Sequence, residues 1–383
     1  MSGPHLRWAA GCMTGTSLDG LDAALVRLEG TGTALTAQFV GLVSRPLGDE
    51  LGCTLRRLAA GEPRPPIDFL RAARQLGRLH AQAVADLCDQ HLPADARLSF
   101  VAAHGQTIWH APQEQLSWQL FDPWPLVRTL NVPVVYDLRQ ADLIAGGQGA
   151  PITPLADWVL YRDADRPRVV VNLGGICNVT VLGPTIQAIH ARDLCPCNIL
   201  LDGVVQRLFP SMRYDDQGRI ARRGRVIPSL RQTVVDQVRA ITQQHRSLGR
   251  EQFPDALLNR WVDAARQQTP QPQDIVASFT AAVADLISQA WRDGLFDNAP
   301  AEVVLAGGGA RNAALVDHLR AKSAAAVRLS DELGIPLEAR EAAAFAVLGA
   351  LSRDGVPITL EQVTGGAQPG VAGAWVYPAG STP

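Results

Sequence analysis

Two short apolar runs joined by a polar turn open the chain. Residues 6–12 and 21–28 alternate or cluster apolar side chains as β-strands do, and the turn between them reads GTSLDG. Residues 68–91 then place apolar groups at intervals of three and four, which predicts an amphipathic helix. Residues 132–138 predict a further strand, whereas the polar stretch 105–118 predicts a loop. This half of the chain therefore combines strands and helices.

A second strand–turn–strand pattern follows at residues 168–182, which read RVVVNLGGICNVTVL. Like the first, it has an apolar strand, a glycine-bearing polar turn and a returning strand. Residues 273–293 predict a long helix, and AEVVLAGGGARN predicts a strand that ends in a glycine loop. Two units of one design indicate an internal duplication with a cleft between the halves. We expect an α/β protein with domains at 1–155 and 156–383, and leave open whether the last residues return to the first domain.

Composition narrows the class of protein. Of 383 residues, 47% are hydrophobic and 19% are charged, which is typical of a globular chain. The formal net charge of -2 gives no general attraction to nucleic acid or to anionic membranes. No run approaches the roughly 18 apolar residues of a transmembrane helix, and the start MSGPHLRWAAG lacks the apolar segment of a signal peptide. We expect a cytoplasmic protein without nucleic-acid or membrane partners.

The basic residues exclude several nucleotide-dependent classes. Lys322 is the one lysine of the chain, and all other residues in the combined count of lysine and arginine are arginines. A Walker-A loop, a protein kinase and a pyridoxal enzyme each need a lysine in a defined context, and Lys322 lies in none of them. Any nucleotide must then be held by backbone N–H groups, a metal ion or arginine.

The first turn, GTSLDGLD, has the composition of a phosphate loop. Gly15 and Gly20 allow the backbone to approach a polyphosphate, and successive N–H groups can form an anion-binding nest. Asp19 or Asp22 would hold a magnesium ion, usually through water. The alternative is an ordinary hairpin loop built from common turn residues.

Two further glycine-rich stretches favour the same chemistry. NLGGICN places Gly174 and Gly175 at the second turn, where they can grip the same phosphate chain. GGGARN, residues 307–312, follows a strand and opens a helix, so a flat group such as an adenine ring can lie against its backbone. It is not the dinucleotide fingerprint, and close helix–strand packing explains its glycines equally well.

Polar residues at strand ends are candidates for substrate contacts and catalysis. His104, Gln106 and Thr107 follow a buried strand and can hydrogen-bond sugar hydroxyls, or they form a simple polar loop. Asp193 precedes a turn and a helix, where a carboxylate can act as a general base. Its alternative role is that of a helix N-cap.

Taken together, these motifs resemble one family, the anhydro-N-acetylmuramic acid kinases of the sugar kinase–Hsp70–actin superfamily. GTSLDGLD, HGQT with WH, DLRQADLIAGGQGAP, LGGICN, LGREQF, GGGARN, EAAAFA and VTGG occur in the family's order between Gly11 and about Pro378. The resemblance implies a two-domain actin-like ATPase fold, built from duplicated ribonuclease H-like domains with an active-site cleft between them. It also implies a homodimer.

The reaction that the resemblance implies belongs to peptidoglycan recycling. Such a sugar kinase opens 1,6-anhydro-N-acetylmuramic acid with water and phosphorylates O6 from ATP with Mg²⁺, giving N-acetylmuramic acid 6-phosphate. Asp193 would take the proton from the attacking water. The residues implied for ATP are Gly15, Thr16, Ser17, Leu18, Asp19, Gly20, Asp22, Gly174, Gly175, Asn178, Gly307, Gly308, Gly309 and Asn312; for Mg²⁺, Asp19 and Asp22; for the sugar, His104, Gln106, Thr107, Arg139 and Asn198.

One stretch departs from the family pattern. The family's usual DTGPGN is DLCPCN here, so Leu194, Cys195 and Cys197 replace a threonine and two glycines. If a glycine position needs positive φ, cysteine there costs about 1 kcal/mol or more. Three hypotheses follow: an active anhydro-sugar kinase, a kinase of another sugar with the same fold, and a non-catalytic ATP-binding paralogue.

Four cysteines lie in or beside these loops. Cys12, Cys177, Cys195 and Cys197 could converge on one cleft and make the protein sensitive to thiol reagents or soft metals. The favoured interpretation is that they are small, unreactive side chains that fill loop positions.

Overall fold

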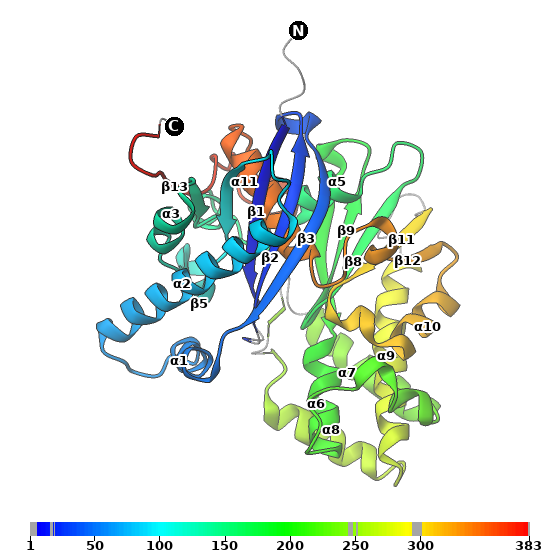
Figure 1. Cartoon of the computed structure of the whole chain (residues 1–383). Coiled ribbons are helices and arrows are strands. Elements are labelled where there is room, and N and C mark those ends of the chain that lie inside the picture. Colours follow the sequence, from blue (N-terminus) through cyan, green and yellow to red (C-terminus); the bar gives the residue numbers. More distant parts are fainter. Residues whose placement is uncertain are drawn as a thin grey trace. The chain divides into compact units, whose positions relative to one another are not determined.

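The computed structural model describes residues 6–15, 18, 20–243, 248–249, 252–292 and 301–381, and the chain forms two compact units (Figure 1). Unit 1 comprises Met1–Tyr161, Thr185–Ile189 and Ala339–Pro383, and unit 2 comprises Arg162–Pro184 and His190–Glu338. The chain leaves unit 1 after Tyr161, six residues beyond the boundary expected at 155. Residues 339–383 belong to unit 1 and not to the second unit.

Unit 1 is built on a six-stranded sheet with the order β13-β7-β4-β1-β2-β3. The first three strands form an antiparallel meander, β4 and β7 run parallel to β1, and β13 is antiparallel to β7. The bounds are β1 (Leu6–Thr14), β2 (Gly20–Glu29), β3 (Thr36–Pro46), β4 (Leu98–Ala103), β7 (Val134–Tyr136) and β13 (Ala374–Val376).

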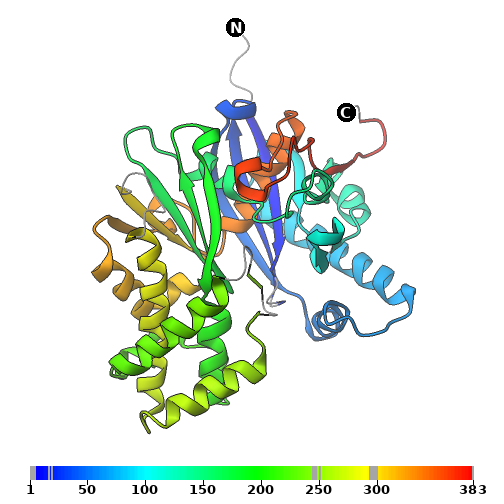
Figure 2. The same cartoon turned by 180° about the vertical axis from the view of Figure 1, so that it is seen from behind.

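Helices cover both faces of this sheet. On one face α2 (Pro66–His91) packs Ala81, Val84 and Leu87 against Cys12 and Leu21 of the first hairpin. On the other face α11 (Arg340–Arg353), orange in Figure 2, lies directly against β1. The remaining helices of unit 1 are α1 (Asp49–Ala59), α3 (Trp124–Leu130), α4 (Gln140–Ile144), α5 (Pro154–Tyr161) and α12 (Glu361–Thr364), with short 3₁₀ turns at Gly32–Ala34, Pro112–Glu114 and Ile186–Ala188.

Gly11 explains how closely α11 approaches the sheet. A Cβ atom at Gly11 would lie 1.9 Å from the carbonyl oxygen of Ala342 and 2.4 Å from the nitrogen of Ala346. Only glycine leaves room for a helix backbone at that distance. The close approach of α11 to β1 therefore requires glycine at position 11.

Unit 2 repeats the strand order of unit 1. Its five-stranded sheet has the order β10-β9-β8-β11-β12, with an antiparallel meander β8–β10 and with β11 and β12 parallel to β8. Apart from the edge strand β13, order and strand directions match those of unit 1, which confirms the predicted duplication and fold class. The bounds are β8 (Arg168–Leu173), β9 (Ile176–Leu182), β10 (His190–Pro196), β11 (Glu302–Ala306) and β12 (Ala326–Leu329).

The helices of unit 2 pack against this sheet around a core of buried aliphatic side chains. They are α6 (Asn198–Leu208), α7 (Pro228–Thr242), α8 (Asp255–Arg266), α9 (Pro272–Arg292) and α10 (Ala313–Lys322), with 3₁₀ turns at Asp216–Gly218, Ala221–Arg223, Gly308–Arg311 and Ser330–Leu333. Among the described residues of both units, no helix is long and apolar enough to cross a bilayer.

One element prediction is wrong. The loop expected at 105–118 forms most of a two-stranded sheet of β5 (Gln106–Ala111) and β6 (Leu116–Leu120). Polar Gln106 and Gln119 are buried in it, while Trp109 and Trp118 are exposed. Because this reverses the usual distribution of polar and apolar residues, the hairpin has no periodicity that a sequence can reveal.

Candidate active-site residues

The turn after β1 is anchored by its flanking residues. Leu18 has a left-handed backbone (φ 57°), and its N–H donates to the carbonyl of Gly15 at 3.1 Å. Its side chain is buried in an apolar cluster with residues of α1, α2 and β6. Thr14 donates its hydroxyl to the carbonyl of Gly105 at 2.6 Å, which ties this turn to the HGQT segment. Three residues predicted to bind ATP or Mg²⁺, Thr16, Ser17 and Asp19, lie outside the described residues.

Asp22 and Gly20 lie at the start of β2. Asp22 pairs with Met13 and so shares the face of the sheet on which Gly11 meets α11. Its carboxylate accepts a hydrogen bond from Ser44 at 2.5 Å. Close packing explains the glycine at position 20, since a Cβ there would lie 2.9 Å from the carbonyl oxygen of Arg45. No group of three metal-ligating side chains occurs among the residues described, which do not include Asp19.

Buried His104 and half-buried Arg139 form a pair at the end of β4. The Nε and Nη2 atoms of Arg139 lie 3.1 and 3.0 Å from Nε2 of His104. Because a guanidinium has only donors, Nε2 accepts and the proton of the neutral ring is on Nδ1, which donates to Gly105 O at 2.9 Å. Burial and the charge of Arg139 hold the pKa of His104 well below its usual value. His104 is thus neutral and orients Arg139.

Gln106, Thr107 and Gln119 line the β5–β6 hairpin. The amide nitrogen of Gln119 donates to Ser117 at 2.7 Å and lies 3.5 Å from the hydroxyl of Thr107. The Oε1 atoms of Gln106 and Gln119 are buried without a hydrogen-bond partner. An unsatisfied buried acceptor costs about 1–3 kcal/mol, so both amides are suited to a donor on a ligand. Gln119 was missed by the sequence because its buried position on β6 was not predicted.

In unit 2 the β8–β9 turn is joined to the start of α6. The carbonyl of Gly175 accepts the N–H groups of Cys197 and Ile199 at 2.9 and 3.2 Å, and the carbonyl of Gly174 accepts that of Asn198 at 3.0 Å. The side chain of Asn198 also donates to the carbonyl of Leu173 at 3.1 Å. These N–H groups of α6 are therefore engaged by the turn, and the two motifs form one rigid element.

The GGGARN loop packs against the same element. A Cβ at Gly307 would lie 2.5 Å from Oδ1 of Asn172, and one at Gly309 would lie 2.7 Å from Oδ1 of Asn198, whereas Gly308 has open space around it. Asn312 uses its side chain to cap α10, accepting the N–H of Leu315 at 3.1 Å. The packing alternative thus applies to Gly307 and Gly309, and close packing does not explain the glycine at 308.

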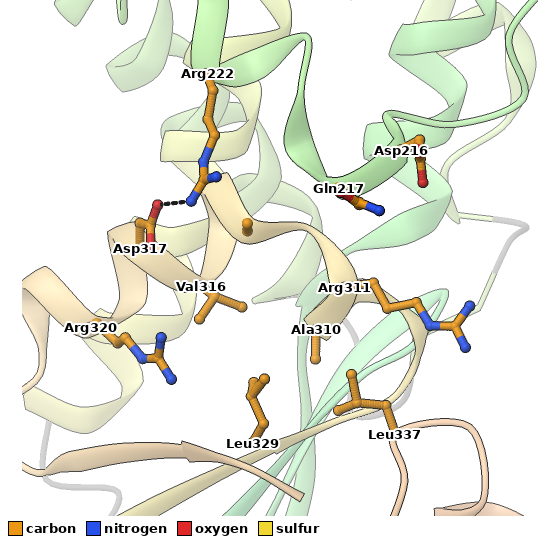
Figure 3. A pocket seen from close by; sticks show the side chains of 11 residues that line it. Asp216, Gln217, Arg222, Ala310, Arg311, Val316, Asp317, Arg320, Leu329 and Leu337 are labelled. Carbon is orange, nitrogen blue, oxygen red and sulfur yellow. Dashed lines mark hydrogen bonds and ion pairs between the residues drawn. The ribbon is translucent and has the colours of Figure 1, made fainter. Parts of the chain in front are cut away.

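A pocket of about 500 Å³ opens beside this loop within unit 2 (Figure 3). Ala310 and Arg311 of the loop lie on its wall, and Arg222 and Asp317 form an ion pair of 2.5 Å at its edge. Apart from residues 310 and 311, no motif marks its lining, because the lining comes from five short segments that are far apart in sequence. The other lining residues are Asp216, Gln217, Ala313, Val316, Arg320, Leu329 and Leu337.

Asp193 lies within β10 and not at a helix start. It pairs with Asn178 of β9, and its Oδ2 accepts the N–H of Leu248 at 2.9 Å. Helix α6 begins at Asn198 with Cys197 at the N-cap position, so the N-cap alternative for Asp193 is wrong. A bulge follows Asp193, because the pairing shifts register before Cys195. Bulges commonly redirect side chains beside active sites.

The cysteines of DLCPCN lie at positions that a side chain can occupy. Neither Cys195 nor Cys197 has positive φ, and Cys197 has φ -120°. Both side chains are fully buried in the apolar core of unit 2, and Leu194 packs against that core. The substitutions therefore point into the protein and do not require the backbone that only glycine adopts.

The hypothesis of a reactive cysteine cluster is wrong. Cys12 lies in the core of unit 1, whereas Cys177, Cys195 and Cys197 lie in the core of unit 2, and all four side chains are buried. Burial raises the pKa of Cys12, Cys177 and Cys197 above that of a free thiol. They fill space in the cores, as the favoured interpretation states.

Comparison with known proteins gives a consistent result. A family model described as anhydro-N-acetylmuramic acid kinase matches residues 7–379. A protein of that name from Bacillus thuringiensis (strain Al Hakam) is 31% identical over 385 residues, covering 98% of this chain and 99% of its own. Its namesake from Bacillus cereus (strain AH820) is 31% identical over 382 residues, covering 97% and 99%. Component A of (R)-2-hydroxyglutaryl-CoA dehydratase from Acidaminococcus fermentans has a structure with 13% identity and a TM-score of 0.47, covering 91% of this chain and 99% of its own.

Proposed function

The chain belongs to the anhydro-N-acetylmuramic acid kinase family, and we propose that it opens 1,6-anhydro-N-acetylmuramic acid with water and phosphorylates O6 from ATP. The products are N-acetylmuramic acid 6-phosphate and ADP. The observation that carries this proposal is the match over residues 7–379, which includes every motif discussed above. A cytoplasmic homodimer stays a prediction.

The buried cysteines favour this activity over its two alternatives. A changed sugar or a lost activity was suggested because DLCPCN departs from the family's stretch. Cys195 and Cys197 are fully buried and have no positive φ, so they neither occupy a left-handed backbone that favours glycine nor narrow a binding space. No observation then favours another substrate or a non-catalytic role.

Asp193 is the proposed general base. Its carboxylate takes a proton from water while the water oxygen bonds to the anomeric carbon and the C1–O6 bond breaks. O6 keeps the electron pair of that bond and attacks the γ-phosphorus, and ADP leaves. The N–H of Leu248 fixes one carboxylate oxygen, Oδ2, and so orients the carboxylate.

Nucleotide binding is proposed for both hairpin turns and the GGGARN loop. In unit 2 the nucleoside would occupy the pocket beside Gly308 and Arg311, and the turn at Gly174 and Gly175 would face phosphate. In unit 1 the N–H groups of the β1–β2 turn would face phosphate. The carboxylate of Asp22, half-buried and bonded to Ser44, suits water-mediated contact with Mg²⁺, as would that of Asp19. When bound, magnesium neutralises phosphate charge.

A coupled assay with 1,6-anhydro-N-acetylmuramic acid, ATP and Mg²⁺ tests the proposal. The wild type is expected to release ADP in step with sugar phosphate, and Asp193→Asn is expected to lose about 10²–10⁴-fold in kcat, the usual contribution of a general base. ATP binding without turnover of this sugar would contradict the proposed function. Full turnover by Asp193→Asn would remove Asp193 from its role and leave the function standing.

A further inference from the structure

A continuous chain of hydrogen bonds crosses unit 1 and passes through Arg139. It links Thr364 to Asp142, Asp142 to Gly149, Gly149 to Arg139 and Arg139 to His104. From His104 it reaches Thr14, because His104 and Thr14 donate to the same Gly105 carbonyl. Segments far apart in the sequence thus fix one guanidinium.

Asp142 is the residue that organises one end of this chain. Its side chain is fully buried, with Oδ1 accepting the hydroxyl of Thr364 at 2.6 Å and Oδ2 accepting the N–H of Gly149 at 2.7 Å. Its own carbonyl accepts the N–H of Gly147 at 2.9 Å. A Cβ at Gly147 or Gly366 would lie 2.2 or 2.8 Å from the carboxylate oxygens, so the glycines of AGGQG and VTGG make room for Asp142.

The other end of the chain leaves Arg139 with donors to spare. A guanidinium has five N–H groups. His104 faces Nε and Nη2, and the carbonyl of Gly149 accepts from Nη1 at 2.6 Å. Each Nη atom therefore keeps one N–H beyond these contacts. Two such groups on one planar fork match the two oxygens of a carboxylate.

The charge of Arg139 also calls for an anion. Both acceptors that fix it, a neutral imidazole and a peptide carbonyl, carry no net charge. Burial lowers the pKa of Arg139 to about 10, opposed by the charge of Glu341, so it remains a cation at neutral pH. A partly dehydrated cation whose hydrogen-bond acceptors are both uncharged binds a carboxylate more strongly than a hydroxyl.

We infer that Arg139 binds the carboxylate of the lactyl ether that distinguishes a muramic acid from a glucosamine, and that Asp142 positions Arg139 for it. The inference rests on the proposed function, which supplies a substrate with this carboxylate. Arg139 then selects the substrate class, and Asp142 is a positioning residue that acts through Gly149 without touching the sugar.

Two sugar phosphates that differ only in the lactyl group provide the test. Calorimetry on the full chain would compare N-acetylmuramic acid 6-phosphate with N-acetylglucosamine 6-phosphate. The wild type is expected to prefer the first. Arg139→Met should lower that preference about 10- to 100-fold, the size expected for loss of one charge-assisted contact, while its affinity for N-acetylglucosamine 6-phosphate stays within about threefold. Arg139→Lys keeps the charge without the fork and should keep part of the preference.

Asp142→Asn tests the positioning role. An amide replaces one of the two acceptor oxygens of Asp142 by a donor and cannot accept from both Thr364 and Gly149, so the Gly149 carbonyl shifts and Arg139 loses its fixed orientation. The preference should fall about 3- to 10-fold, as expected for about 1 kcal/mol, with binding of N-acetylglucosamine 6-phosphate unchanged. Gln140→Ala is the matched control on the same helix, since that side chain only donates to the carbonyl of Gln115. It should leave the preference unchanged.

Each outcome decides one claim. Turnover of the anhydro-sugar by a wild type that binds both phosphates equally would overturn the inference and leave the proposed function intact. An unchanged preference in both Arg139→Met and Arg139→Lys would also overturn it. Equal losses for both sugars in Asp142→Asn would show a purely structural role for Asp142. Absence of turnover in the wild type would instead count against the proposed function.

Discussion

The β1–β2 turn of unit 1 and the β8–β9 turn of unit 2 occupy the same place in two sheets of matching strand order, yet they are anchored differently. In unit 2, the carbonyls of Gly174 and Gly175 accept N–H groups from the start of α6, so backbone hydrogen bonds fix the turn. In unit 1, Leu18 anchors the turn in an apolar cluster and Thr14 donates to Gly105. Anchoring by the backbone tolerates side-chain changes that anchoring by side chains does not.

The two units also bury different titratable groups. Unit 1 buries two neutral histidines, His80 and His104, beside Cys12, whereas the described residues of unit 2 bury Cys177, Cys195 and Cys197 and no histidine. Protonation of a buried histidine creates a charge in an apolar site, but a buried thiol stays neutral from acid to neutral pH. The comparison therefore predicts that acid and side-chain truncation weaken unit 1 first.

The largest expected effect is acid destabilisation of unit 1. Burial lowers the pKa of His80 from 6.5 to about 4, and that of His104 also falls well below its usual value. The unfolded chain binds these protons at higher pH than the folded one, so stability is full above pH 6.5 and is lost as pH falls toward 4. His80 alone accounts for about 3 kcal/mol of this loss.

Hydrogen exchange at pH 7 and pH 4.5 measures the effect in each unit. Amides of β1, β4 and α2 should lose protection more than those of β8, β11 and α9. His80→Leu removes one of the protonating groups and should reduce the pH dependence in unit 1. Equal losses of protection in the two units would show that the difference in buried titratable groups does not cause the acid destabilisation.

Truncation of Leu18 is expected to have the next largest effect. Leu18→Ala removes a buried side chain that joins the turn to α1, α2 and β6, and large-to-small core changes cost about 2–5 kcal/mol. Because Leu18 keeps 7% exposure, a loss of about 2 kcal/mol is expected. Urea denaturation measures it, with Leu116→Ala on the exposed end of β6 as the control. If Leu18→Ala leaves the free energy of unfolding unchanged, the turn is held by other residues.

The duplicated hairpins could be predicted because their chemistry is local. Each combines apolar strands of period two with a glycine turn, and helices such as α2 show a clear period of three to four residues. Asp142 could not be predicted as an organiser. Its partner Thr364 is 222 residues away, and no local pattern encodes a contact over that separation. The glycines of AGGQG and VTGG mark this site only after the structure shows that both make room for the carboxylate of Asp142.

The roles of single motif residues were equally hard to predict. Asn312 caps α10, and Gly307 and Gly309 allow close packing, although all three lie in the stretch expected to hold adenosine. The residue types required for a cap or for close approach are those that suit a ligand loop. The open space around Gly308 distinguishes a position suited to a ligand from the closely packed positions of Gly307 and Gly309.

A smaller effect is expected from Thr14→Val. This change keeps the shape of the side chain and removes the hydroxyl that bonds to Gly105. The Gly105 carbonyl still accepts from His104, so a loss of about 1 kcal/mol is expected. Thr14→Ser should retain the wild-type free energy of unfolding to within about 0.5 kcal/mol if the hydroxyl is the group that matters. A larger loss in Thr14→Ser than in Thr14→Val would assign the effect to packing of the methyl group.

The smallest effect on activity is expected in unit 2, where the backbone fixes the turn. Cys195→Ala and Cys197→Ala each remove a sulfur that faces the core, while the N–H of residue 197 still donates to Gly175. We expect kcat/KM to stay within about threefold and the free energy of unfolding to fall by about 1 kcal/mol in each variant. Alkylation of the folded protein should modify exposed Cys53 and spare both buried cysteines. A large loss of activity at unchanged stability would show that a side chain of DLCPCN, and not its backbone, serves the reaction.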